Sequence, residues 1–273
     1  MKMNQRKKTR LLLILSVAFL AVVAVAGIFL RDSAMVTDFS RKNLAPCFQY
    51  PFGTDWLGRD MFHRTITGLS MSILIGVCAA FVSAVIAFAL GVMAATLGKK
   101  VDSAISFTID TIMGIPHILL LILISYAMGK GLKGVIVGIA LSHWTSLARL
   151  IRGEVMQLKE SEYIQIAEKL GHSTLKIAMK HMVPNLLSQF LVGLVLMFPH
   201  AILHEASITF LGFGLSVEQP AIGIILSESM QYLITGKWWL ALFPGLMLVL
   251  TVVLFEMVGT SLRKVLDTSS AHR

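Results

Sequence analysis

Charged residues are scarce in this chain of 273 residues: Asp, Glu, Lys and Arg together make up only 14% of it. A soluble globular domain is close to a quarter charged, so this composition, with 56% hydrophobic residues, predicts an integral membrane protein instead. The net charge of +9 comes from basic residues grouped in short segments beside apolar runs. Because these residues form no basic face interleaved with aromatics, we expect no binding to nucleic acid.

Cysteine is nearly absent too, with Cys47 in a polar segment and Cys78 in an apolar run. These two are not expected to form a disulfide, and they lack the spacing of a cysteine metal site. The chain also lacks a G-x-x-x-x-G-K-[ST] phosphate loop, a G-x-S-x-G motif and paired carboxylates, and His204-Glu205 is not followed by the second histidine of H-E-x-x-H. We therefore expect no enzyme and no bound cofactor in this chain, so energy coupling requires a partner.

Apolar runs dominate what is present, and they predict an all-α, polytopic membrane protein with six transmembrane helices. The runs cover residues 11–30, 70–97, 104–128, 135–148, 186–206 and 239–259. A helix of about 20 residues spans roughly 30 Å, the thickness of a bilayer core. A cleaved signal peptide ending near Ala24-Val25-Ala26 is the alternative interpretation of the first run.

Basic residues set the expected orientation. They concentrate in residues 1–10 and 149–180, so the positive-inside rule places both termini and the second of these segments in the cytoplasm. We divide the chain into residues 1–69, which hold the N-terminal tail, the first transmembrane helix and an outer-face loop, and residues 70–273. The second part is a transmembrane domain of five helices with a cytoplasmic loop at about 149–185.

A polar stretch, residues 163–185, interrupts the apolar sequence and is expected to dock a partner in the cytoplasm. Gly171 separates two helical halves, Ser173 offers an N-cap oxygen to the second half, and this second run leads to Pro184. The first half carries apolar residues at helical spacing on one face: Tyr163, Ile166, Ala167 and Leu170.

The same stretch resembles the cytoplasmic EAA loop of ABC importer permeases, in which E-A-A, three residues, Gly and nine residues precede I-x-L-P. The matching positions are Gln165-Ile166-Ala167, Gly171 and His181-Met182-Val183-Pro184. Gln165 stands in place of the acid and Ile166 in place of the first alanine, while the spacing from Gly171 to Pro184 is kept. In that family the loop seats a helix in a groove of the ATPase subunit, so the resemblance implies an ATPase-coupling role.

A second segment resembles the F-G-T-D-x-x-G-R-D signature of the peptide/nickel permease subfamily. Its signature positions are Gly53, Thr54, Asp55, Gly58, Arg59 and Asp60. The charges of Asp55, Arg59 and Asp60 can pair and fold a compact turn against the outer membrane surface. We therefore expect a structural role for this segment rather than substrate contact.

The resemblance covers nearly the whole chain and implies the type I ABC importer permease fold. It implies the C-type half of a heteromeric permease in a bacterial or archaeal inner membrane, surrounded by membrane lipid. The implied partners are a B-type permease subunit, two ATPase subunits that hold ATP and Mg²⁺, and an extracytoplasmic solute-binding protein.

Ionisable residues inside the fifth apolar run are candidates for the substrate path, because such groups are costly in a bilayer unless they face a cavity or a partner. They are His200, His204 and Glu205. His200 and His204 lie four residues apart on one helix face, where two imidazoles can transiently hold one metal cation. The alternative is that both histidines hydrogen-bond across the permease interface. His117, which follows Pro116, is interpreted as a cap for a carbonyl freed at a proline kink.

Nickel, free or chelated, is the expected substrate because imidazole suits it, and di- or oligopeptides are the alternative. The H-x-x-x-H pattern and the Ser142-His143-Trp144 run resemble nickel permeases more than dipeptide permeases. Two other classes remain open. A stand-alone secondary transporter would show internal repeats, and we see none. An intramembrane metalloenzyme built on His200, His204 and Glu205 would lack a third ligand at a recognisable spacing.

Overall fold

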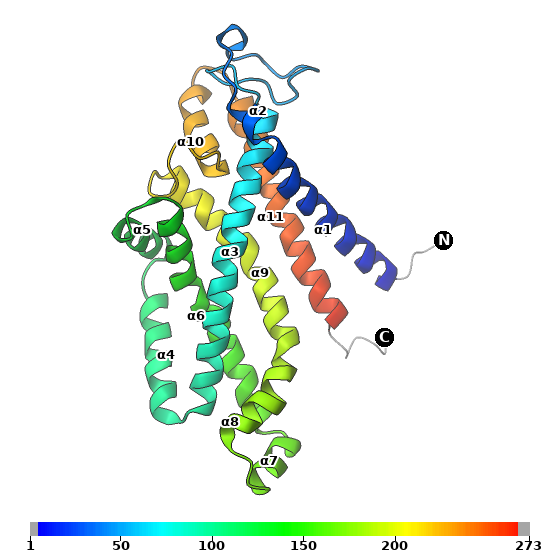
Figure 1. Ribbon diagram of the computed structural model, residues 1–273, viewed down its shortest axis with the longest axis vertical. Helices are drawn as coiled ribbons and strands as arrows, with labels where there is room; N and C mark the ends of the chain where they lie inside the picture. The colour runs from blue at the N-terminus through cyan, green and yellow to red at the C-terminus, as the bar shows by residue number, and fades with distance from the viewer. Residues whose placement is uncertain (1–4, 267–273) are drawn as a thin grey trace.

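Long helices lie along one axis of the structure, a computed structural model that describes residues 5–266 (Figure 1). Five helices are long and apolar enough to cross a membrane, which confirms the all-α membrane architecture. They are α1 (Gln5–Phe29), α3 (Met61–Thr96), α6 (Gly131–Lys159), α9 (Val183–Phe210) and α11 (Trp239–Leu266). The shorter helices are α2 (Arg31–Met35), α4 (Lys99–Met113), α5 (His117–Ala127), α7 (Glu162–Lys169), α8 (Thr174–Ile177) and α10 (Ile222–Leu233). No β-strand occurs within residues 5–266.

The third predicted span, residues 104–128, is not a single helix. α4 ends at Met113, α5 begins at His117, and the two helices are bent by 97° relative to each other. Pro116 explains the break, because its ring lacks an N–H donor and disfavours a helical conformation in the residue before it. α5 has 11 residues and rises only about 16 Å. Six spans therefore result only if the bent pair counts as one.

Small buried residues let other helices approach α3 closely. They are Gly76, Ala79, Ala80, Ala84, Ala87 and Gly91. A Cβ at Gly91 would lie 2.8 Å from the carbonyl oxygen of Ala148 in α6, and a Cβ at Gly76 would lie 2.5 Å from the side chain of Ile202 in α9. Close backbone approach at small residues is a common way for helices to pack in membranes. α3 is thus the helix against which α6 and α9 are fitted.

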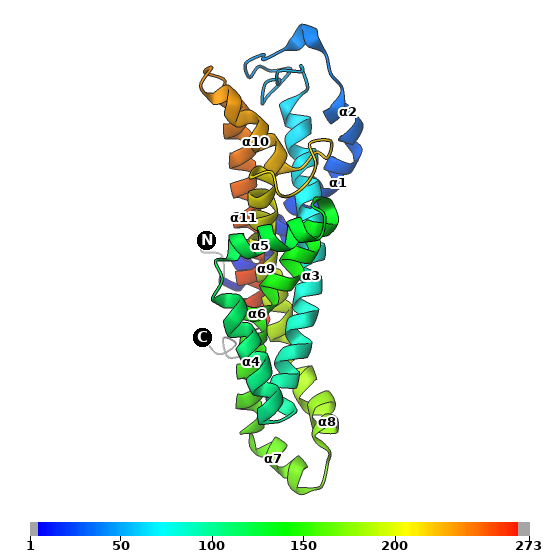
Figure 2. The same ribbon diagram turned by 90° about the vertical axis from the view of Figure 1, so that its left-hand side faces the viewer.

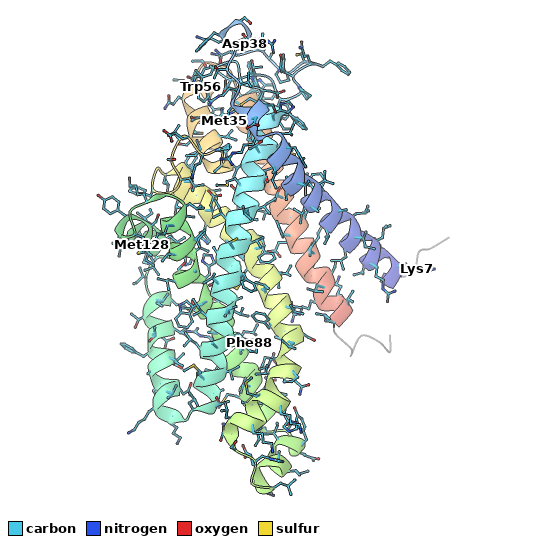
Figure 3. All side chains as sticks on the ribbon, viewed as in Figure 1. Lys7, Met35, Asp38, Trp56, Phe88 and Met128 are labelled. Atoms are coloured by element: carbon cyan, nitrogen blue, oxygen red, sulfur yellow. The ribbon has the colours of Figure 1, made fainter. Side chains whose placement is uncertain are left out.

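α3 also joins the outer loop to the bundle. It begins at Met61, so the proposed division between residues 69 and 70 falls inside this helix. Further along, Phe88, labelled in Figure 3, packs edge-on against Phe190 of α9 with the ring centroids 5.1 Å apart.

The two polar parts of the chain lie at opposite ends of the long axis (Figures 1 and 2). The loop over residues 36–60, between α2 and α3, forms one end, which we call the outer loop. α7 and α8 form the other end. The N-terminal end of α1 and the C-terminal end of α11 both point away from the outer loop (Figure 1).

Pro184 does not end a separate helix, contrary to the simple expectation of two short helices. Helical structure continues from Thr174 to Phe210, with a π-helical turn at Ala178–Met182 just before the proline. A proline ring clashes with the carbonyl four residues before it, and the wider π turn accommodates that clash without ending the helix.

A substitution at Gly223 of α10 tests how closely α10 packs on α9. A Cβ there would lie 2.5 Å from the carbonyl oxygen of Ala206, a backbone atom that cannot rotate away. We expect Gly223→Ala to lower the thermal unfolding midpoint of the purified protein, since overpacking costs roughly 1–3 kcal/mol. Gly245→Ala in α11 is the matched control, because the nearest atom to its Cβ would be 3.9 Å away. Equal midpoints for the two variants would contradict the packing described.

Candidate functional site

A cavity of about 640 Å³ lies beside the bend between α4 and α5. Its wall consists of the end of α4, the break at residues 114–116, the start of α5, and residues of α6 and α9. Figure 2 shows α5 about halfway along the long axis, so the cavity lies at mid-depth of the bundle. Histidine and hydroxyl side chains supply its polar lining: His117, Ser142, His143, Thr145, Ser146, His200 and His204.

Three of these histidines come from different helices and meet at one point. His117 is the first residue of α5, His143 lies in α6 and His204 lies in α9. One ring nitrogen of each lies within 4.8 Å of the other two, and the ring centroids are 4.4, 4.6 and 5.0 Å apart. In the part of the chain that the structure describes, this is the one group of three potential ligands close enough to hold a metal ion. We call it the histidine cluster.

His200 lines the same cavity but does not join the histidine cluster. Its side chain is 63% exposed, and its Nε2 lies 4.0 Å from Glu256 of α11. The structure therefore places His204 with His117 and His143 rather than pairing it with His200 alone. The interpretation of His117 as a carbonyl cap is also wrong, because its Nε2 is buried without a hydrogen-bond partner among the described residues.

Glu205 points away from the cavity, although it follows His204 directly. It is fully buried, and the Thr209 hydroxyl donates a hydrogen bond to its Oε1 at 3.0 Å. Consecutive helix residues are about 100° apart around the axis, which explains why these neighbours face different sides. The other carboxylate oxygen of Glu205, Oε2, is buried and has no hydrogen-bond partner among the described residues. The structure thus removes Glu205 from the predicted substrate path.

The outer loop folds around one buried carboxylate. Asp55 is fully buried and accepts hydrogen bonds from Nε of Arg59 at 2.6 Å and from a guanidinium nitrogen of Arg64 at 2.7 Å. The backbone N–H groups of Leu57 and Arg59 donate to the same carboxylate at 2.8 and 2.9 Å. Arg64 also donates to Glu228 of α10 at 2.8 Å. These ion pairs tie the outer loop, α3 and α10 together.

The remaining signature residues shape the turn around Asp55. Asp60 does not pair with an arginine among the described residues; it caps α3 by accepting hydrogen bonds from backbone N–H groups of the first turn. Thr54 is fully buried. Gly53 and Gly58 have φ angles of +72° and +75°, in the left-handed region that favours glycine. The compact turn is therefore present, but Asp60 caps α3 instead of pairing with Arg59.

The polar segment at the other end presents apolar side chains to its surroundings. α7 buries Ile164 and Ala167, whereas Tyr163, Ile166 and Leu170 are 43%, 56% and 73% exposed. The predicted apolar face is therefore split. Ala167 packs inward with Ile164, which the spacing did not identify, and the other three residues form an exposed apolar surface.

The loop after α7 is open and locally hydrogen-bonded. Gly171 has a φ of +81°, and no atom lies within 4 Å of the position that a Cβ would take. Ser173 is the N-cap of α8, as the sequence predicts. Gln165, in the place of the family's acid, donates to a backbone carbonyl just before α7 at 3.1 Å. The amide of Asn185 in α9 donates to the Tyr163 hydroxyl at 3.1 Å and so joins α9 to α7.

Comparison with known proteins links this architecture to transport proteins. Residues 87–271 match the profile of the family described as binding-protein-dependent transport system inner membrane component. The chain is 34% identical to the dipeptide transport system permease protein DppC of Bacillus subtilis, over 91% of this chain and 78% of that protein. It is 33% identical to the oligopeptide transport system permease protein OppC of the same organism, over 93% and 83%. The glutathione transport system permease protein GsiD of Escherichia coli is 32% identical, over 91% and 84%.

A solved structure shows the same fold. The inward-facing methionine ABC transporter MetNI superposes with a TM-score of 0.63, over 76% of this chain and 98% of that chain. The sequence identity to that chain is 18%, so the likeness concerns the fold alone.

A substitution at Arg64 tests whether the buried ion pairs stabilise the outer loop. Arg64→Ala removes the arginine that hydrogen-bonds both Asp55 and Glu228, whereas Arg59 stays paired with Asp55. Breaking a buried pair costs up to about 3–5 kcal/mol. We expect a matching loss in the free energy of unfolding, measured by denaturant titration of the purified protein. Arg41→Ala is the control, because the side chain of Arg41 is 50% exposed in its pair with Asp38, and such pairs contribute about 0–1 kcal/mol. Similar losses for both variants would show that the network does not stabilise the fold.

Proposed function

Since the chain belongs to the family of binding-protein-dependent transport system inner membrane components, we propose that it lines half of a membrane path for di- or oligopeptides. It is a membrane permease subunit with the type I ABC importer fold, a transporter component rather than an enzyme in itself. One observation carries the substrate class: the relatives at 32–34% identity are named for dipeptides, oligopeptides and glutathione. The cavity of about 640 Å³ agrees, because small-ligand sites measure roughly 300–1,000 Å³.

Nickel, the substrate expected from the sequence, is not supported by these relatives. Both histidines on which that expectation rested line the cavity, but His204 belongs to the histidine cluster and the more exposed His200 does not. We therefore propose the peptide alternative as the transported substrate.

The proposed importer needs further subunits. A B-type permease subunit would complete the path, two ATPase subunits would bind ATP and Mg²⁺, and an extracytoplasmic solute-binding protein would deliver the peptide. Exposed apolar side chains on the outer faces of α5 and α11 support contacts with membrane lipid or a second permease subunit. Examples are Leu119, Leu123, Leu246 and Val249, which are 55–66% exposed.

The arrangement of the two ends supports an orientation in the bacterial cell (inner) membrane. The ends of α1 and α11 that are nearest the termini point away from the outer loop, in the direction of α7 and α8 (Figure 1). The basic residues of the chain also concentrate in these parts. Both findings support a cytoplasmic position for the termini and for α7, with the outer loop on the external side.

We propose that α7 docks on an ATPase subunit through its exposed apolar surface. Tyr163, Ile166 and Leu170 form that surface, and Leu175 of the neighbouring α8 is exposed too, at 71%. Closure of the ATPase subunits would displace α7 and, through the helix that starts at Thr174, rotate the spans as rigid bodies around the cavity. ATP would thereby drive the opening of the path to one side and then the other.

Gly171→Val tests the coupling role. A β-branched side chain at a φ of +81° is strained by about 1–2 kcal/mol, so we expect α7 to lose its orientation and peptide uptake to fall several-fold while ATP hydrolysis continues. Gly98→Val is the matched control, because Gly98 has a φ of +92°, is equally open, and lies between α3 and α4. Uptake of a labelled dipeptide and ATP hydrolysis are measured in proteoliposomes. If both variants transport alike, α7 does not couple transport in the way proposed.

Deletion of the gene in its host tests the substrate class. Uptake of radiolabelled di- and oligopeptides should fall on deletion and return when the chain is supplied from a plasmid, because the proposed path lacks one half without it. Uptake of radioactive nickel is followed in the same cells. Chain-dependent nickel uptake with unchanged peptide uptake would overturn the proposed peptide substrate.

A further inference from the structure

The histidine cluster contains nitrogens that neither the fold nor a peptide path accounts for. We propose that His117, His143 and His204 form a binding site for one divalent first-row transition metal ion, taken up as the free ion or as a chelate with a peptide. The proposal goes beyond the peptide substrate and does not depend on it, because all three donors belong to this chain.

Two nitrogens of the cluster are buried and unpaired. Nε2 of His117 and Nε2 of His143 have no hydrogen-bond partner among the described residues. A buried polar atom without a partner costs about 1–3 kcal/mol, and native proteins rarely keep such atoms without a reason such as an ion. Both side chains belong to the group of three histidines that, among the described residues, has the spacing for a metal.

His143 uses only one of its two ring nitrogens for hydrogen bonding among the described residues. Its Nδ1 lies 3.1 Å from the backbone carbonyl oxygen of Ile139 and 3.1 Å from the Ser142 hydroxyl. In the tautomer in which Nδ1 donates to that carbonyl, Nε2 carries the lone pair that a metal needs. Metal-binding histidines are commonly oriented by such a hydrogen bond from the second ring nitrogen.

Spacing and donor type select the class of metal. Zinc–nitrogen bonds of about 2.0–2.1 Å place tetrahedral ligands about 3.4 Å apart. The separations of up to 4.8 Å reach that value through small side-chain rotations that draw the rings together around an ion. All three donors are imidazoles, so the cluster suits Co²⁺, Ni²⁺, Cu²⁺ or Zn²⁺ and not Mg²⁺ or Ca²⁺, which prefer oxygen.

The cavity leaves room for a ligand that the substrate supplies. A metal on three imidazoles keeps at least one coordination position open, and here that position faces a cavity of about 640 Å³. The amino nitrogen or the carboxylate of a peptide can fill it. His200, one helical turn from His204 and 63% exposed in the same wall, offers a further imidazole on the approach.

Cobalt absorption tests the site in the complete importer, purified with its partner subunits on a tag without histidine. Wild type should bind one more equivalent of Co²⁺ per copy of this chain than the His117→Ala/His143→Ala/His204→Ala variant, with visible d–d bands that Zn²⁺ abolishes and excess Mg²⁺ does not. His117→Ala and His204→Gln should each weaken binding about tenfold or more. His63→Ala is the control, because His63 lies beside Asp60 at the outer start of α3 and should bind as wild type does.

Size-exclusion elution and ATP hydrolysis show whether each variant assembles. If the triple variant does not assemble, the single variants of His117 and His204 decide, since both side chains are only partly buried. Equal Co²⁺ binding in wild type and in the assembled cluster variants would overturn the proposal, as would competition by Mg²⁺.

A second titration distinguishes the two sources of metal. Co²⁺ mixed beforehand with the dipeptide Gly-His should bind more tightly than free Co²⁺ if the site takes a chelate, and less tightly if it takes the free ion. Either result supports the site, provided that the triple variant does not bind Co²⁺ in that form. Peptide uptake tests the peptide substrate independently of the metal site. If wild type takes up peptide but binds no Co²⁺, only the metal site is overturned. If wild type binds Co²⁺ but shows no chain-dependent peptide uptake, only the peptide substrate is overturned.

Discussion

In a bilayer, backbone N–H and C=O groups must find partners within the protein, and the bend between α4 and α5 is the place where this constraint shapes the molecule. Several backbone groups at the break find partners within the chain. The N–H of Gly114 donates to the carbonyl of Asp110 at 2.9 Å, and the N–H of Leu120 donates to the carbonyl of Pro116 at 3.1 Å. Pro116 itself has no N–H to satisfy. The bend creates the recess beside α6 and α9 and turns His117 into it, so the cavity and the histidine cluster both depend on this one interruption.

A network of paired, largely buried charges is the second constraint in this fold, and Glu205, which is also fully buried, lies apart from it. Asp55, Arg59, Arg64 and Glu228 lie where the outer loop meets α3 and α10, and each carboxylate has an arginine partner within 3 Å. Such networks contribute little net stability when complete, because desolvation offsets the attraction, but they penalise any other arrangement of the chain. The network therefore fixes the position of the outer loop, whereas the tightly packed small residues of α3 fix the spans.

The sequence predicts much of this structure where the signal is local. Apolar runs identify the spans, the pairing of Asp55 with Arg59 follows from their spacing, and Gly171 marks the end of α7 because the turn needs a positive φ. What the sequence does not show is contact between distant segments. Arg64 donates to the carboxylate of a residue 164 positions away in the sequence. The histidine cluster depends on a 97° bend and on the rotation of three helices about their axes. The spacing of residues in the sequence identifies only neighbours on the same helix. The continuous helix through Pro184 cannot be predicted for a different reason. The π turn before Pro184 lets the helix continue through proline, a residue that usually ends a helix.

The same two helices that flank α7 carry two of the three clustered histidines. α6 ends at Lys159, just before α7, and carries His143; the helix that starts at Thr174 carries His204 roughly 45 Å further along its axis. A displacement of α7 that changes the angle between these helices changes the distance between His143 and His204 to the extent that the second helix moves as one body through its π turn, Pro184 and Pro199. His117 stands on α5, beyond the bend, and is not carried by either helix. Three nitrogens that hold a metal at separations of about 3.4 Å release it when one of them moves farther than side-chain rotation can follow. If α7 docks on an ATPase as proposed, affinity at the cavity therefore changes with the state of that ATPase.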